Sequence, residues 1–334
     1  MIILAIESSC DETSCAIVKD GIEVLSNSVS SQIDIHKEYG GVFPEVASRL
    51  HVENINIVIK DAMAKANVDF KDIDAIAVTQ GPGLVGSLHI GVMAAKTLAW
   101  SLNIPLIPVQ HIAGHIYANK LAGELKFPLL ALVISGGHTE LVYMKEDYVF
   151  EVIGKTQDDA VGEANDKVGR LLGLPYPGGP VVDKMAQTGK PNYKLPKVKT
   201  ENPLDFSFSG LKSAVRQTML REERENRDIV VEDMCYAFQH AAVDTLMERV
   251  HLALEKYPVE TFVLAGGVAA NSEVRKRVSA LKEVHNEMSI LQPPLWACMD
   301  QAAMIGLAGQ VAFDKGYRAD CEMSALSNNP LPTY

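Results

Sequence analysis

The chain has 334 residues, of which 47% are hydrophobic and 6% aromatic, a composition typical of a folded α/β protein and not of a disordered chain. Its formal net charge of −11 excludes nucleic-acid binding through bulk charge, so any such role must rest on local basic segments. No apolar run reaches the roughly 18 residues that a membrane span needs, and the first residues turn acidic at Asp11 without a basic leader. We therefore expect a cytoplasmic protein without membrane association.

Two segments concentrate positive charge in this acidic chain. One runs from Lys190 to Lys199, and the other is Arg275-Lys276-Arg277. Clustered basic side chains are the usual contacts of a protein with nucleic-acid phosphates. The alternative is an ordinary solvated surface, and the residues alone leave both interpretations open.

A three-stranded β-meander is predicted over residues 3–24, because apolar stretches alternate with polar turns and Asp20-Gly21 favours a tight turn. Its first connection is rich in hydroxyl and carboxylate side chains, namely Ser8, Ser9, Asp11, Glu12 and Thr13. The polar groups of this half therefore gather at one strand-to-strand turn.

Helices and strands are predicted to alternate after the meander. Residues 45–67 have helical periodicity without Gly or Pro, and residues 73–80 are typical of a strand. The loop Gly81–Ser87 then leads into a predicted helix from Leu88 to Trp100.

The next segment, residues 104–123, combines a short strand with two histidines. Residues 104–109 are apolar and lead directly into a predicted helix that carries His111 and His115. Side chains four apart on a helix lie on the same face, roughly 5–6 Å between Cβ atoms, which suits two imidazoles that hold one divalent metal. The alternative is a pair of polar histidines on an amphipathic helix.

A second meander begins at Leu129 and matches the first in order and spacing. Its stretch 131–135 aligns with 4–8, and its turn Gly136–Thr139 aligns with the polar turn of the first copy, at an offset of roughly 126–127 residues. A late strand at 261–267, again followed by a helix, completes the parallel. This repetition predicts a duplicated domain, with two unrelated meanders as the alternative.

Three turns are rich in glycine and small residues: Gly81–Ser87, Ser135–Thr139 and Ala265–Asn271. Glycine lets the backbone approach a phosphate closely, and amides at a helix start attract anions. None of the three matches a P-loop or a G-x-G-x-x-G fingerprint. Their distribution over both halves of a duplicated fold nevertheless favours a bound nucleotide.

These features resemble the actin, Hsp70 and sugar-kinase superfold and, within it, the TsaD/Gcp family of bacterial tRNA N6-adenosine threonylcarbamoyltransferases. The resemblance covers nearly the whole chain and is carried by ESSCDETS (7–14), YGGVFPEVASRLH (39–51), GPGLVGSLHIG (81–91), HIAGH (111–115), VISGGHTEL (133–141), GEANDKVGRLLGLPYPGGP (162–180), FSFSGLKSAV (206–215), LAGGVAAN (264–271) and MDQAAMIG (299–306).

The resemblance implies an α/β fold of duplicated actin-like ATPase lobes, of the ASKHA and RNase H-like type, with a nucleotide cleft between them. We expect an N-terminal lobe over 1–119, completed by the C-terminal helix 300–334. The C-terminal lobe is expected over 120–299, with a helical insertion at about 151–258.

The resemblance also implies one divalent metal per chain, iron or zinc, held by His111, His115 and Asp300. Two imidazoles and a carboxylate with open positions suit such an ion. Asp300 precedes a predicted helix, so an N-cap is the alternative role for its side chain.

The implied reaction moves the threonylcarbamoyl group from threonylcarbamoyl-AMP to N6 of the adenosine 3′ of the anticodon in tRNAs that read ANN codons, with release of AMP. The cleft would hold this adenylate or an ATP-like nucleotide. By motif match, the turn from Ile134 to His138 (Ile134, Ser135, Gly136, Gly137 and His138) would line the phosphate. Asp166 and Asp183 would bind the ribose hydroxyls, and Gly179 and Asn271 would lie by the nucleoside. Glu7, Asp11 and Glu12 are candidates for a general base.

The implied partners are tRNA, a shorter TsaB-like paralogue, for which the helix 45–67 is a candidate dimer face, and a TsaE-like P-loop ATPase. Three other functions remain as alternatives: an ATP-dependent small-molecule kinase or ATPase, a non-catalytic scaffold, and a metallopeptidase. The last is disfavoured because Ile112 stands where H-E-x-x-H needs its glutamate.

Overall fold

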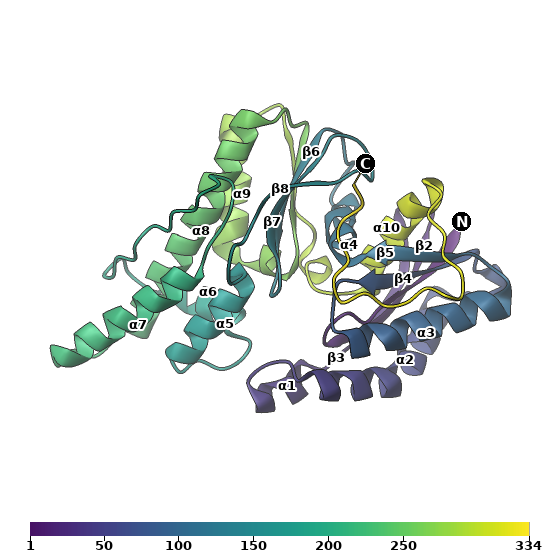
Figure 1. The fold of residues 1–334 in the computed structure, drawn as a ribbon, viewed down its shortest axis with the longest axis horizontal. Coiled ribbons are helices and arrows are strands. Elements are labelled where there is room, and N and C mark those ends of the chain that lie inside the picture. Colours follow the sequence, from purple (N-terminus) through teal and green to yellow (C-terminus); the bar gives the residue numbers. More distant parts are fainter. Residues whose placement is uncertain (334) are drawn as a thin grey trace. The chain divides into compact units, whose positions relative to one another are not determined.

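The computed structural model describes residues 1–333, and the chain divides into two units. Unit 1 contains residues 1–124 together with the segment from Pro293 onward, and unit 2 contains Leu125–Gln292. In Figure 1, unit 1 is coloured purple and blue with a yellow C-terminal segment, and unit 2 is teal to green. No helix among the described residues is long and apolar enough to cross a membrane.

Unit 1 is built on a mixed five-stranded sheet in the order β3-β2-β1-β4-β5. The first three strands form the predicted antiparallel meander, and β4 and β5 continue the sheet parallel to β1. The strands are β1 (Ile2–Glu7), β2 (Glu12–Lys19), β3 (Glu23–Ser31), β4 (Ala75–Gly81) and β5 (Leu106–Gln110).

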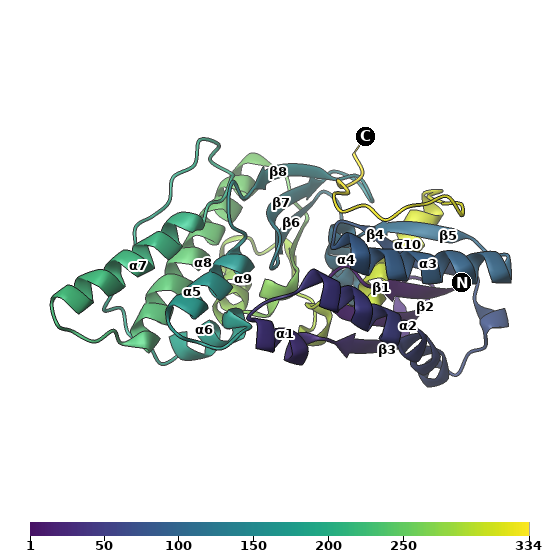
Figure 2. The same cartoon turned by 60° about the horizontal axis from the view of Figure 1, so that its bottom comes forward.

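Helices cover both faces of this sheet, as Figures 1 and 2 show. Leu4 and Ile6 of β1 belong to a hydrophobic core with side chains of α2 and α3. Ala5 points the other way because side chains alternate along a strand, and it packs against α10. There Gly306 is required, because a Cβ would lie 2.5 Å from Val18 Cγ2. The helices are α1 (Ile33–Tyr39), α2 (Pro44–Ala66), α3 (Val85–Leu102), α4 (His111–Tyr117) and α10 (Ala302–Asp314), with the short 3₁₀ turns η1 (Phe70–Asp72), η2 (Ala118–Leu121) and η4 (Leu295–Ala297).

Unit 2 repeats the same strand plan, with the order β10-β9-β6-β7-β8. Its first three strands are again an antiparallel meander, and β9 and β10 again run parallel to its first strand. The strands are β6 (Leu129–Ile134), β7 (Thr139–Met144), β8 (Glu151–Lys155), β9 (Thr261–Ala265) and β10 (Ser289–Leu291). The predicted duplication is therefore confirmed, down to the neighbours of each strand.

The long connection between β8 and β9 is helical. Its helix α6 packs against both α5 and α8. The helices of unit 2 are α5 (Val161–Leu171), α6 (Gly178–Ala186), α7 (Ser209–Arg224), α8 (Val231–Lys256) and α9 (Ser272–Val284), with the 3₁₀ turn η3 (Gly267–Ala270).

Some element boundaries differ from those expected from the sequence. The helix expected from Leu88 begins at Val85, because the second half of the glycine loop already forms the first turn of α3. The C-terminal helix covers only residues 302–314, and residues 315–333 are irregular apart from an isolated bridge between Ala319 and Leu106.

Glycine allows the same close approach in both units. In unit 1, a Cβ on Gly83 would lie 2.6 Å from the carbonyl oxygen of Ser9, in the turn after β1. In unit 2, Gly266 has a φ of +92° and a Cβ there would lie 2.3 Å from the carbonyl oxygen of Ile134, at the end of β6. In each unit, therefore, a glycine turn lies directly against the first strand's polar end.

Candidate metal centre and substrate-binding residues

Two buried histidines lie where β5 passes into α4. Gln110 is the N-cap of α4, and its side-chain oxygen accepts a hydrogen bond from Ala113 N at 2.9 Å. This cap starts the helix at His111, so His111 and His115 stand one turn apart on the same face. Their ring centroids are 4.7 Å apart, and the rings meet edge to face.

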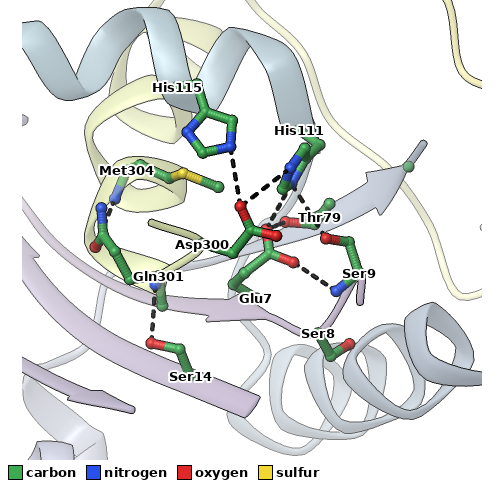
Figure 3. Close-up of polar contacts among 12 residues, drawn as sticks. Glu7, Ser8, Ser9, Ser14, Thr79, His111, His115, Asp300, Gln301 and Met304 are labelled. Carbon is green, nitrogen blue, oxygen red and sulfur yellow. Dashed lines mark hydrogen bonds and ion pairs between the residues drawn. The ribbon is translucent and has the colours of Figure 1, made fainter. Parts of the chain in front are cut away.

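Asp300 lies opposite these rings, held by the start of α10 (Figure 3). Its Oδ1 is 3.0 Å from His115 Nε2 and 3.6 Å from His111 Nε2. The N-cap of α10 is Gln301, whose side chain accepts from Met304 N, and not Asp300. Ser14 of β2 accepts a further hydrogen bond from Ala302 N. The alternative role of Asp300 as the helix cap is therefore wrong.

The three side chains fit a divalent metal ion. One ligand atom from each of His111, His115 and Asp300 can be chosen so that all lie within 4.8 Å of one another. Donors that bind one ion at about 2.0–2.2 Å lie roughly 3–3.6 Å from each other, which matches the distances to Asp300. A set of two imidazoles and one carboxylate suits zinc or iron and leaves coordination positions open.

The far side of His111 contacts a buried carboxylate. His111 Nδ1 is 3.1 Å from Glu7 Oε2 and 3.2 Å from Ser9 Oγ. The Glu7 carboxylate also accepts hydrogen bonds from Thr79 Oγ1 at 2.6 Å and from Ser9 N at 2.5 Å. Because a carboxylate only accepts, Nδ1 carries a proton, and Nε2, on the side of Asp300, is the atom left to bind a metal once its own proton is lost.

Charge on Glu7 and charge on His111 favour each other in the metal-free protein. Burial raises the pKa of Glu7, but the charge and hydrogen bond of His111 outweigh it and lower that pKa. Burial lowers the pKa of His111, but the charges of Asp300 and Glu7 outweigh it and raise that pKa from 6.5 to about 9. A metal must therefore displace a proton from His111 on binding.

This ion pair predicts how the stability of the metal-free protein depends on pH. Because the folded-state pKa of His111 is raised, its stabilisation is complete below pH 6.5 and is lost as the pH rises through about 9. We expect the free energy of unfolding to fall by up to about 3 kcal/mol over this range. Urea unfolding of chelator-treated protein measures the change. If the free energy of unfolding of His111→Gln fell by the same amount over this pH range, groups other than His111 would be responsible for the effect.

The carboxylates proposed as a general base differ in burial. Glu7 is fully buried, and its carboxylate accepts three hydrogen bonds. These contacts suit a residue that orients His111 better than one that takes a proton from a substrate. Burial, together with the charge of Asp11, raises the pKa of Glu12 well above its usual range. Asp11 is partly exposed and follows Cys10 in the turn after β1. Of the three, Asp11 has the side chain that solvent reaches most readily.

Three elements hold the carbonyl groups of this turn. Ser9 O accepts from Leu84 N at 2.8 Å, and Asp11 O accepts from Gln32 N at 3.0 Å. Cys10 O accepts from His51 Nε2 at 2.9 Å. His51 lies on α2, is fully buried, and was not among the expected site residues. The sequence does contain a sign of this burial. His51 lies four residues from both Ala47 and Ile55, so helical periodicity places it on the buried face of α2.

The contacts of His51 identify its tautomer. Nε2 donates to the Cys10 carbonyl, so Nδ1, 2.7 Å from Thr13 Oγ1, accepts from the hydroxyl. Burial lowers the pKa of His51, in keeping with a neutral ring. We expect His51→Ala to cost about 1–3 kcal/mol in unfolding free energy, because it leaves two buried polar groups unpaired.

The same variant is expected to lower kcat roughly tenfold by loosening the turn that carries Asp11. His51→Gln keeps an N–H donor for the Cys10 carbonyl and should restore most of both losses. Thermal unfolding and kcat at saturating substrates are the measurements. Equal rates in His51→Ala and the unsubstituted protein would limit His51 to a role in stability.

The candidate phosphate-binding turn of unit 2 follows β6. Ile134 is the buried last residue of the strand, and Ser135 closes the turn with a hydrogen bond from its N to His138 O at 2.8 Å. Ser135 Oγ accepts from His138 N at 3.0 Å. Gly136 and Gly137 are exposed, and a Cβ on either would meet nothing within 4 Å. The turn thus presents backbone with open space around it.

The other candidate substrate residues fall into two groups on neighbouring helices. Asp166 of α5 accepts from Gly178 N at 2.7 Å, beside Gly179 at the start of α6, and its burial raises its pKa. Asp183 of α6 accepts from Ser272 N and Oγ at 3.0 and 2.6 Å and from Gln239 Nε2 at 3.1 Å. Asn271 donates to Gln239 Oε1 at 3.1 Å and caps α9.

Comparisons with known proteins agree with this architecture. A family model described as "TsaD: tRNA N6-adenosine threonylcarbamoyltransferase" matches residues 23–307. The Bacillus subtilis (strain 168) protein named tRNA N6-adenosine threonylcarbamoyltransferase is 53% identical over 335 residues, covering 100% of this chain and 97% of its own length. A Bacillus licheniformis protein of the same name is 54% identical over 333 residues, covering 99% and 98%.

Solved structures with the same fold are more distant in sequence. The crystal structure of T. kodakarensis HypF matches with a TM-score of 0.62 and 15% identity, over 94% of this chain and 48% of that one. Component A of the Acidaminococcus fermentans (R)-2-hydroxyglutaryl-CoA dehydratase matches with a TM-score of 0.54 and 14% identity, over 94% and 98%. These two share the duplicated fold. On the family model and the full-length relatives, the chain belongs to the TsaD family of tRNA N6-adenosine threonylcarbamoyltransferases.

Proposed function

We propose that this chain transfers the threonylcarbamoyl group from threonylcarbamoyl-AMP to N6 of the adenosine 3′ of the anticodon in tRNAs that read ANN codons. The products are N6-threonylcarbamoyladenosine and AMP. Family membership over the whole chain supports the reaction. The structural observation that carries the proposal is the convergence of His111, His115 and Asp300 with Glu7 behind His111. We further propose that the protein acts in the cytoplasm.

The metal dependence is a further part of the proposal. His111 and His115 would bind iron or zinc through Nε2 and Asp300 through its carboxylate. When bound, the ion supplies a positive charge that holds an anionic oxygen of the substrate and offsets developing charge. Glu7 keeps His111 in the tautomer that leaves Nε2 available.

The bond changes of the transfer need a proton acceptor but no covalent enzyme intermediate. N6 of the adenosine attacks the carbamoyl carbon, the bond from that carbon to the phosphate oxygen breaks, and AMP leaves with the electron pair. One proton is lost from N6. Asp11 is the best placed of the proposed bases, since it is partly exposed while Glu7 and Glu12 are buried. Because the mixed anhydride is already activated, orientation of the two reactants supplies most of the rate.

The adenylate would be bound by residues of unit 2. The Ser135–His138 turn suits the phosphate, because Gly136 and Gly137 are exposed and leave open space beside the backbone. Asp166 and Asp183 would accept hydrogen bonds from the ribose hydroxyls, and Gly179 and Asn271 would lie beside the nucleoside. The shared network of Asp183, Gln239 and Asn271 supports a common role for these side chains.

We further propose a TsaB-like paralogue and a TsaE-like P-loop ATPase as protein partners. The helix α2 is a candidate docking face for the paralogue. Val52 and Ile57 of α2 are apolar but leave 57% and 61% of their surface exposed, which supports this assignment.

A transfer assay with defined substrates tests the proposed function. The protein would be given synthetic threonylcarbamoyl-AMP and unmodified tRNA, with and without a TsaB-like partner, and digested nucleosides would be read by mass spectrometry. We expect N6-threonylcarbamoyladenosine to form in proportion to the amount of tRNA supplied. Brisk ATP hydrolysis by the chain without any modified nucleoside would instead favour the kinase or ATPase alternative.

A further inference from the structure

A strip of lysines in unit 2 has no part in the site described above. We call residues 190–199 the lysine strip. It holds Lys190, Lys194, Lys197 and Lys199 and no acidic residue, although the chain as a whole has a formal charge of −11. The strip belongs to the irregular connection that leads from α6 towards α7.

Buried charged side chains of α8 hold the backbone of the strip. Asp233, only 5% exposed, accepts from Lys190 N at 2.8 Å and from Asn192 Nδ2 at 2.7 Å. Arg249, only 6% exposed, donates from Nη2 to Val198 O at 3.2 Å. A buried charge requires hydrogen-bond partners, so these contacts tie both ends of the strip to one helix. The segment is thus irregular in secondary structure but held in place.

The side chains of the strip alternate between the protein and solvent. Tyr193, Leu195 and Val198 are half-buried, whereas all four lysines are exposed. Tyr193 Oη accepts from Val230 N at 3.2 Å, which adds a third anchor. The apolar side chains therefore hold the strip down while the ammonium groups face outward.

The positive charges of the strip are largely uncompensated. Within residues 1–333, Lys197 pairs with Glu248 at 3.6 Å, where both side chains are well exposed, and Lys190, Lys194 and Lys199 pair with no carboxylate. An exposed ion pair of this kind contributes little to stability. The exposed Glu201 follows the strip in sequence and is its nearest acidic neighbour along the chain.

The start of α7 packs against the strip. Gly210 lies against Val198, since a Cβ on Gly210 would be 3.6 Å from Val198 Cγ2. Lys212 and Arg216 lie about 160° and 120° around the helix from Gly210, so they belong to another side of α7. The basic surface is therefore the strip itself.

We propose that the lysine strip binds backbone phosphates of the tRNA substrate. The inference rests on the proposed function and adds the surface that holds the tRNA. Exposed lysines are strongly hydrated point charges on flexible stems, so they suit phosphates at varied positions and read no base. Their binding energy comes from release of counterions, which makes it strongly dependent on salt.

The test compares two triple variants with equal changes in net charge. The strip variant is Lys194→Gln/Lys197→Gln/Lys199→Gln. The matched control is Lys71→Gln/Lys282→Gln/Lys315→Gln, at exposed lysines outside the strip. All six side chains are exposed, so both proteins should fold, and equal thermal unfolding temperatures verify this.

We expect the strip variant to bind tRNA about tenfold or more weakly at physiological salt, and its slope of log K against log salt to be smaller by about 2–3. KM for tRNA should rise with kcat unchanged. The control should match the unsubstituted protein, and arginine at the three strip positions should restore the slope.

Any of three results would overturn the proposal. One is an unchanged salt slope in the strip variant, and another is an equal loss of affinity in the control. Loss of binding to an acidic peptide or to heparin, with an unchanged KM for tRNA, would also overturn it and assign the surface to another polyanion. Failure of the proposed function is a separate result, since the unsubstituted protein would then form no modified nucleoside at any tRNA concentration.

Discussion

His111→Ala, His115→Ala and Asp300→Ala are each expected to release the bound metal and to lower the rate of transfer by more than about a hundredfold. Each change removes one of three donors that lie within 4.8 Å of one another. Loss of a supporting contact alone typically lowers metal affinity roughly 10- to 100-fold, so loss of a ligand should exceed that. Metal content by mass spectrometry and the yield of modified nucleoside are the two measurements.

The control for these variants is His251→Ala, which removes an exposed histidine of α8 outside the metal centre. It should keep both the metal and the activity. Metal added at concentrations that saturate the unsubstituted protein should not restore the activity of the three alanine variants. Full activity in a variant that no longer holds metal would separate the reaction from the metal centre and refute the proposed metal dependence.

Glu7→Gln is expected to weaken metal binding about 10- to 100-fold without removing a ligand. Glutamine has nearly the size of glutamate but lacks the charge that holds the Nδ1 proton of His111. In the metal-free variant the pKa of His111 should fall, because the Glu7 carboxylate is one of the charges that raise it. Competition with a chelator of known affinity measures the metal affinity, and NMR titration of the metal-free protein measures the pKa of His111.

The matched control for Glu7→Gln is Glu12→Gln. Burial and the neighbouring Asp11 raise the pKa of Glu12 well above its usual range, so a neutral amide should resemble the native group. Metal affinity should then be unchanged in Glu12→Gln. The transfer rate of Glu7→Gln should recover at saturating metal if Glu7 acts through His111. A rate that stays low in the fully loaded variant would assign Glu7 a direct part in the chemistry.

Much of the fold follows from short-range patterns in the sequence. The two meanders were predictable because the alternation of apolar residues repeats at a constant offset, and the structure confirms the duplication in both sheets. The pairing of His111 with His115 was predictable as well, because the geometry of one helical turn depends only on local backbone angles. Family resemblance, and not the residue pattern, supplied Asp300.

The tertiary structure decided which distant groups meet. Asp300 is 185 positions from His115, and Glu7 is 104 positions from His111. Their contacts depend on how α10 and β1 pack in unit 1, which no local pattern encodes. The structure excludes the helix-cap role for Asp300, because Gln301 is the N-cap of α10 and its side chain accepts from Met304 N. His51 likewise acquired a role only when α2 brought it to the Cys10 carbonyl.

The sequence by itself therefore determined the repeated strand plan and the pair of histidines that we propose as metal ligands. Only the tertiary structure decided the position of Asp300, the proposed third ligand, the carboxylate behind His111 and the anchors of the lysine strip. The physical reason is that secondary structure reflects periodicities of a few residues, whereas a site depends on the simultaneous packing of segments that are far apart in the chain.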